Sequence, residues 1–126
     1  MIKNIFKNIL KKEKNNQNTN IIVVKFKNNI KTKALLDTGS YGKNSNFINN
    51  KLIKKLNLQN QIYYINETIE TISDKLQLKK CILLEFYIND KYYKKKFYIL
   101  DLDSKDFDII LGYDFLKQNN IININI

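Results

Sequence analysis

The residue best placed for chemistry is Asp37, which ends a short apolar run and is followed by Thr38, Gly39 and Ser40. A strand ending in this way presents a carboxylate at its tip, and the glycine lets the backbone pass close to a ligand. The threonine hydroxyl can hydrogen-bond locally and brace the turn. Because a bare Asp-Thr-Gly also arises by chance in turns, the apolar residues 34–36 carry much of the signal.

The composition limits the chemistry in which Asp37 can take part. The chain has no histidine and a single cysteine, Cys81. This excludes Ser-His-Asp and Cys-His catalysis, and it argues against a zinc or other soft-metal site. Acid–base chemistry must therefore rest on Asp, Glu, Lys or Tyr, and we expect no metal and no cofactor. One cysteine also excludes an internal disulfide, which fits a reducing compartment and leads us to expect a cytoplasmic protein.

A second motif late in the chain strengthens the first. Residues 107–112 read Phe-Asp-Ile-Ile-Leu-Gly, and Tyr113, Asp114, Phe115 and Leu116 follow directly. The apolar run stops abruptly at Gly112, as the earlier run stops at Asp37. Two such motifs in this order are fairly specific, although neither would be so alone.

The elements that must position these motifs are mostly short strands. Apolar and β-branched patterns predict strands, with tight turns at residues 28–29 and 89–90. We expect strands at residues 21–26, 30–36, 61–72, 76–88, 92–100 and 121–126, a buried run at 107–111, and a helix or turn at 47–56. A short helix is predicted at residues 113–118. This pattern indicates a mainly β domain, either a closed barrel or a sandwich.

The N-terminal stretch differs from the rest of the chain. Apolar residues recur at helical spacing up to Leu10, and a polar, Asn-rich segment follows. We therefore divide the chain into a helix and linker at residues 1–18 and one domain at 19–126. The helix is either a loosely docked terminus, a membrane-surface contact or a targeting segment. No apolar run is long enough to span a bilayer, so we expect no transmembrane segment.

With these motifs in place, the sequence resembles the retropepsins, the aspartic proteases of retroviruses and Gypsy-like retrotransposons. The resemblance rests on Leu-Leu-Asp-Thr-Gly-Ser ending at Ser40, on Asn46-Phe47-Ile48, and on the motif around Gly112. It covers the chain from about residue 21 onward. It implies a retropepsin-like closed β-barrel monomer with one short C-terminal helix and an obligate homodimer.

The resemblance also implies roles for individual residues. Asp37 would pair with its symmetry mate as the catalytic dyad, and Thr38 would lock the two active-site loops across the two-fold axis. The Gly39 backbone would line the substrate groove, while Ser40 and Gly112 would support the active-site loop. A flap over the substrate would have its tip at Ile72, Ser73 and Asp74, and the terminal strand 121–126 would interleave with its partner.

The chemistry agrees with this assignment. Peptide hydrolysis by carboxylates needs two of them, one to take a proton from water and one to polarise the scissile carbonyl. Two adjacent carboxylates share a proton because both cannot ionise. This chain carries one Asp-Thr-Gly, so a second chain must supply the other carboxylate. We expect an aspartic endopeptidase that acts on an extended peptide, such as a retroelement polyprotein.

Three departures keep an alternative open. The stretch around residues 41–45 is longer than usual for the family, no glycine lies between Gly42 and Gly112 to loosen the flap, and the alternation of Asn and Ile at the C-terminus is weakly specific. The alternative is a retropepsin fold that has lost catalysis and serves as a dimerisation or peptide-binding module.

The net charge of +10 raises a third possibility, a nucleic-acid-binding protein. All basic residues are lysines, whereas base recognition usually favours arginine. We therefore expect a solvated lysine-rich surface and no specific nucleic-acid partner. The acidic residues Asp101, Asp103, Asp106 and Asp108 are expected to be solvated turn charges, and Cys81 a buried small hydrophobe.

Overall fold

We describe the fold from a computed structural model that covers residues 20–37, 46–70 and 75–121. Within these ranges the chain forms seven strands, two short α-helices and one 3₁₀ turn. In chain order they are β1 (Ile21–Lys25), β2 (Lys31–Leu36), β3 (Phe47–Asn49), α2 (Asn50–Lys55), η1 (Gln59–Gln61), β4 (Tyr63–Glu70), β5 (Lys75–Ile88), β6 (Lys91–Leu100), β7 (Ile109–Leu111) and α3 (Tyr113–Gln118).

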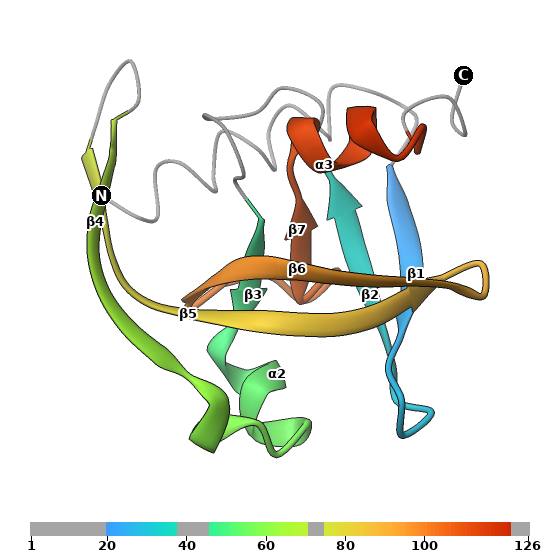
Figure 1. Cartoon of the computed structure of the whole chain (residues 1–126), viewed down its shortest axis with the longest axis horizontal. Coiled ribbons are helices and arrows are strands. Elements are labelled where there is room, and N and C mark those ends of the chain that lie inside the picture. The colour runs from blue at the N-terminus through green and yellow to red at the C-terminus, as the bar shows by residue number, and fades with distance from the viewer. Residues whose placement is uncertain (1–19, 38–45, 71–74, 122–126) are drawn as a thin grey trace.

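The strands form one sheet that curls into a barrel-like ring. Their order is β1-β2-β7-β3-β6-β5-β4, and β1 also pairs with β5. That closing contact is a single residue pair, Lys25 with Tyr87. Among the described strands, β4 pairs only with β5 and lies outside the ring, as its curved path at the left of Figure 1 shows. The predicted mainly β fold is therefore confirmed.

The long hairpin of β5 and β6 shows why these sequences form strands. Buried and exposed residues alternate along most of β5, so one face packs inward and the other meets solvent. Phe86 lies at the centre of the inward face and is fully buried. Its ring lies 5.5 Å from Tyr93, 5.5 Å from Phe97 and 5.8 Å from Phe115, measured between centroids. The core therefore joins β5, β6 and α3.

Asparagine and aspartate form the tight turns of this glycine-poor chain. Asn29, Asn89 and Asp90 have φ of 66°, 49° and 66°, the left-handed values that hairpin turns require. Asn57 and Asn120 have φ of 58° and 57° just after α2 and α3, where helices commonly end in this conformation. The predicted turns at residues 28–29 and 89–90 are confirmed.

The structure corrects one predicted element. The expected helix or turn at residues 47–56 begins as strand β3 and becomes helical only at Asn50. Phe47 and Ile48 pair with β6 on one side and β7 on the other, and both are buried. These long-range pairings outweigh the local helical spacing. The switch falls at Asn49, whose side chain accepts a hydrogen bond from the Lys51 backbone N–H and caps α2.

Several other predictions can be compared with the structure. The helix at 113–118 is confirmed as α3, and Cys81 is buried. The predicted N-terminal helix, and all of the predicted terminal strand 121–126 except Ile121, lie outside the described residues. Neither of the described α-helices has the length and apolar character needed to cross a membrane.

Candidate functional site

Asp37 lies at the end of β2 and is buried, with 6% of its surface exposed. Its backbone N–H donates a hydrogen bond of 2.9 Å to the carbonyl of Leu111 at the end of β7. A carboxylate in such a position keeps little contact with bulk water.

The parallel pairing of β2 and β7 brings the two sequence motifs together. The register aligns Ala34 with Ile109, Leu35 with Ile110 and Leu36 with Leu111. Both strands end at the same edge, beside α3, as Figure 1 shows. Asp37 and Gly112 are the next residues of the two strands and therefore lie side by side. That the run ending at Gly112 supports the active-site loop stays a prediction, because residues 38–45 lie outside the described residues.

Asn46 is a buried polar residue that sequence reasoning did not include among the site residues. Its side-chain Oδ1 accepts a 2.8 Å hydrogen bond from the Gly112 backbone N–H, and its backbone carbonyl accepts one of 2.8 Å from Tyr98. Its Nδ2 lies 3.5 Å from the carbonyl of Lys96. Asn46 directly precedes β3, so these bonds connect the start of β3 to both Gly112 and β6. Its place within the Asn-Phe-Ile motif was the only signal in the sequence.

A second buried network lies at the opposite end of β7. Asn49 Nδ2 donates to Asp108 Oδ1 at 3.1 Å and to the Leu102 carbonyl at 3.2 Å. Thr32 Oγ1 donates to Asp108 Oδ2 at 3.1 Å. The prediction that Asp108 is a solvated turn charge is therefore wrong, because both of its oxygens bind neighbouring side chains. Asp101 is exposed, as expected.

A polar cluster joins Glu67 on β4 to Lys96 and Tyr98 on β6, and the pKa values of Lys96 and Tyr98 are raised. Burial raises the pKa of the Tyr98 hydroxyl. Burial alone would lower the pKa of Lys96, but the hydrogen bond to Glu67 and the proximity of Tyr98 outweigh it, so the Lys96 pKa lies above its ordinary value. Lys96 Nζ lies 3.3 Å from Glu67 Oε2 and 4.8 Å from the Tyr98 ring centroid. The cluster links β4 to β6 across β5.

The remaining predicted site residues cannot be placed. Thr38, Gly39 and Ser40, and the predicted flap residues Ile72, Ser73 and Asp74, lie outside the described residues. The strands on either side of residues 71–74 are described, and their register pairs Glu70 with Lys75. Across the described parts of the chain, no three His, Cys, Asp or Glu side chains gather in an arrangement that could hold a metal ion.

The fold and this site define a class of protein, the retroviral-type aspartic protease. The sequence profile of the retroviral aspartyl protease family matches residues 2–126, and the chain belongs to that family. No curated protein sequence matches the chain significantly.

Two solved structures show the same fold. One is the EIAV protease complexed with the inhibitor HBY-793, with a TM-score of 0.63 and 17% identity over 84% of this chain and 92% of that one. The other is the retroviral protease-like domain of Ddi1 from Leishmania major, with a TM-score of 0.61 and 16% identity over 81% of this chain and 78% of that one. At such identities the similarity establishes the fold alone.

Proposed function

We propose that the chain is an aspartic endopeptidase that acts as a homodimer and hydrolyses peptide bonds in extended polypeptides, such as a retroelement polyprotein. The observation that carries the proposal is the buried Asp37 carboxylate at the paired ends of β2 and β7, beside Gly112. Membership of the retroviral aspartyl protease family supports it. Retropepsin-like proteases typically dimerise, which supports the homodimer.

The proposed mechanism needs Asp37 from both protomers. The pair carries one shared proton, because two adjacent carboxylates cannot both ionise. The ionised member takes a proton from a water molecule while that water attacks the scissile carbonyl. The protonated member donates a hydrogen bond to the carbonyl oxygen and stabilises its developing negative charge. The proton taken up is then available for the leaving amine.

The local structure suits this role. The hydrogen bond from the Asp37 N–H to Leu111 holds the backbone at the carboxylate, and the Asn46 bond to Gly112 fixes the neighbouring strand end. A reacting group held in place needs less reorganisation as charge develops. The roles of Thr38, Gly39 and Ser40 in the active-site loop, and of Ile72, Ser73 and Asp74 in a flap, are part of the proposal.

The test is cleavage of a mixed peptide library by the wild type, Asp37→Asn and Asp101→Asn, assayed between acidic and neutral pH. Asp101 is exposed, so the second variant makes the same chemical change away from the site. We expect Asp37→Asn to lower cleavage at least about a hundredfold, the range for losing an acid–base group. Asp101→Asn should retain activity, and a statine-type transition-state mimic should block the wild type.

The dimer is measured on the same samples by sedimentation. Cleavage by Asp37→Asn at the wild-type rate would rule out the proposed dyad. A wild-type dimer that cleaves nothing would favour the alternative, a retropepsin fold kept for dimerisation or peptide binding. A protein that stays monomeric at high concentration would contradict the homodimer itself.

A further inference from the structure

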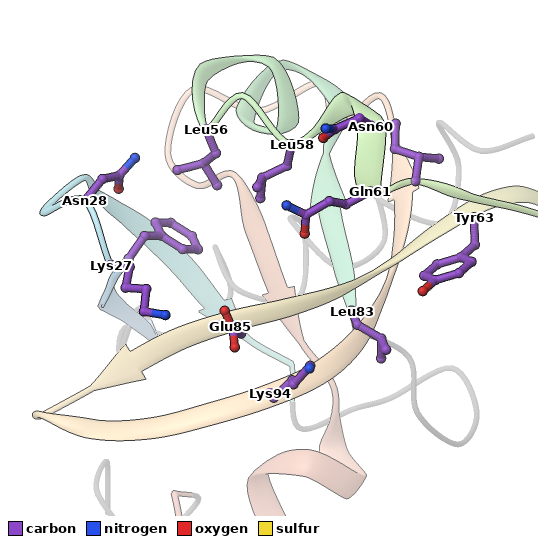
Figure 2. A pocket seen from close by; sticks show the side chains of 12 residues that line it. Lys27, Asn28, Leu56, Leu58, Asn60, Gln61, Tyr63, Leu83, Glu85 and Lys94 are labelled. Atoms are coloured by element: carbon purple, nitrogen blue, oxygen red, sulfur yellow. The ribbon is translucent and has the colours of Figure 1, made fainter.

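An open pocket of about 630 Å³ lies at the end of the ring opposite to Asp37. Figure 2 shows its three walls: the turn between β1 and β2, the connection from α2 to β4, and the middle of β5 and β6. β2 separates this end from the site. It starts beside the β1–β2 turn and ends at Asp37, a span of roughly 20 Å at about 3.3 Å per residue.

The pocket combines an apolar floor with a basic rim. Phe26 and Leu56 are buried at its base, while Leu83 on β5 leaves 47% of its surface exposed. Lys27 and Lys94 lie on the rim and are exposed, and within the described chain no ion pair engages either of them. A volume of this size falls in the range of ligand-binding pockets.

Glu85, the acidic side chain on the β5 wall of the pocket, has a hydrogen-bond partner. The Tyr92 hydroxyl donates a 2.8 Å hydrogen bond to Glu85 Oε1. This bond raises the pKa of Tyr92. The hydrogen bond leaves Glu85 charged, and Glu85 lies opposite Lys94 in the β5–β6 register. Two lysines against one carboxylate give the rim one net positive charge, which suits a ligand that is itself acidic.

The β5 wall of the pocket is a strand edge without a strand partner. On the side away from β6, Cys81 pairs with Tyr63 of β4, and Tyr87 pairs with Lys25 of β1. Within the described chain, residues 82–86 have no pairing on that side. Leu83 and Glu85, which lie in this gap, line the pocket. An edge of this kind presents backbone N–H and C=O groups that can pair with another chain.

We propose that this pocket binds an extended segment of a partner protein, which adds to β5 as a short strand in the gap between β1 and β4. The segment has alternating apolar and acidic side chains. The apolar ones point inward and pack on Phe26 and Leu56. The acidic ones point outward toward Lys27 and Lys94, on the face that Leu83 shares with Lys94. Strand addition of this kind takes affinity from main-chain hydrogen bonds and selectivity from alternate side chains. The partner is distinct from the cleaved substrate, because the pocket is remote from Asp37.

The free strand edge is what favours a peptide over a nucleic acid. The positive rim would attract an acidic peptide and a nucleic acid alike, but only a polypeptide backbone can complete the hydrogen bonding of residues 82–86. A nucleic acid would instead be held through its phosphates and any base stacking. The two ligands therefore predict different effects of the same variants.

The test follows backbone amide signals by NMR while the 126-residue chain is titrated with an acetylated, amidated peptide of about five alternating Leu and Glu residues, which matches the length of the gap. Asp37→Asn protein is used so that no cleavage occurs, and the wild type is compared. We expect saturable shifts centred on residues 82–86 and on the β1–β2 turn. Leu83→Asp should weaken binding at least about tenfold, because it places a negative charge beside the acidic side chains of the peptide.

Matched controls separate strand addition from charge alone. Lys27→Gln with Lys94→Gln should weaken binding, whereas Lys33→Gln with Lys51→Gln, which removes the same charge elsewhere, should not. Two further peptides are each N-methylated at one of the two sets of alternate amides. The peptide methylated at the amides that face β5 should not bind, and the other should bind as before. Four results would overturn the proposal. They are an equal loss of binding from both lysine pairs, binding of both methylated peptides, shifts centred on Leu111 and Asp37, and no saturable binding. Tighter binding of oligothymidylate at the same residues would overturn it in favour of a nucleic acid. None of these results depends on protease activity.

Discussion

Asn46 shows how a single amide side chain can hold a candidate active site together. It is 4% exposed, and it accepts the Gly112 N–H while its own backbone carbonyl accepts that of Tyr98. Among the described residues, the Asn46 side chain is the one that accepts the Gly112 N–H. Removing the amide would leave a buried donor without a partner beside Asp37.

We therefore predict that Asn46→Ala lowers the free energy of unfolding by about 1–3 kcal/mol, the cost of an unsatisfied buried donor. Urea denaturation measures this loss, and Asn60→Ala, an exposed site, should change it little. If the chain cleaves peptides, kcat should fall more than KM rises, since Asn46 acts on positioning. Unchanged stability in Asn46→Ala would mean that water replaces the lost oxygen.

Cys81 gives a prediction about pH. Burial raises the pKa of its thiol, so less thiolate is present at any given pH than for a free cysteine. We expect Ellman's reagent to react slowly with the folded protein at mildly alkaline pH and rapidly after unfolding in urea. The rate should also keep rising beyond the pH at which free cysteine levels off. A folded protein that reacts as fast as the unfolded one would show that the thiol is exposed.

At the scale of single residues, the reactive group could be predicted from the sequence, but the side chains that hydrogen-bond around it could not. Asp37 and Gly112 stand in recognisable motifs, and their adjacency follows from the pairing that those motifs imply. Asp108 stands in an acidic stretch and looks solvated, yet it accepts bonds from Thr32 and Asn49. Its partners lie 76 and 59 residues away in sequence, so no local pattern could reveal them.

Among the elements, the β5–β6 hairpin and α3 share one aromatic core. Phe86 contacts Tyr93, Phe97 and Phe115, and Tyr93 also meets Phe115 with 5.2 Å between ring centroids. α3 follows directly from Gly112. The packing of this core therefore also sets where the end of β7 lies.

We predict that Phe86→Ala lowers the free energy of unfolding by about 3–5 kcal/mol, through lost burial and the cavity left behind. That is a large part of the stability of a typical small domain. Tyr64→Ala removes an aromatic ring that is 81% exposed and should cost less than about 0.5 kcal/mol. Urea denaturation of both variants makes the comparison. Similar losses in the two would place Phe86 outside a tightly packed core.

The strands were predictable where alternation is long and turns are marked, as in β5, β6 and their asparagine–aspartate turn. β3 was not, because Phe47 and Ile48 share a helical spacing with the apolar residues up to Leu56. They become a strand only because they pair between β6 and β7. The pocket beside β5 was also beyond sequence reasoning. It exists because β1 touches β5 at a single pair, and such a gap depends on how the ring closes.

On the scale of the whole molecule, charge opposes the proposed dimer. Each chain has a formal net charge of +10 at pH 7, so two chains repel one another over a distance set by the salt. Raising the salt shortens that distance, from roughly 14 Å at about 50 mM to a third of that at about 500 mM. Apolar contacts between the chains are not weakened in the same way.

We accordingly predict that the dimer becomes tighter as sodium chloride is raised from about 50 to about 500 mM. Sedimentation velocity at several protein concentrations gives the dissociation constant at each salt concentration. Any cleavage activity measured at low enzyme concentration should rise in parallel. The opposite trend would indicate that ion pairs across the interface outweigh the repulsion between the chains.

The position of β4 outside the ring has a practical consequence. Its outer edge is unpaired in the described sheet, and Tyr63 and Tyr64 are 58% and 81% exposed. Such an edge has no built-in stopping point, so copies can add to it one after another. Concentrated stocks should therefore lose protein slowly to thioflavin-positive fibrils, and a lysine in place of Tyr64 should lengthen their shelf life.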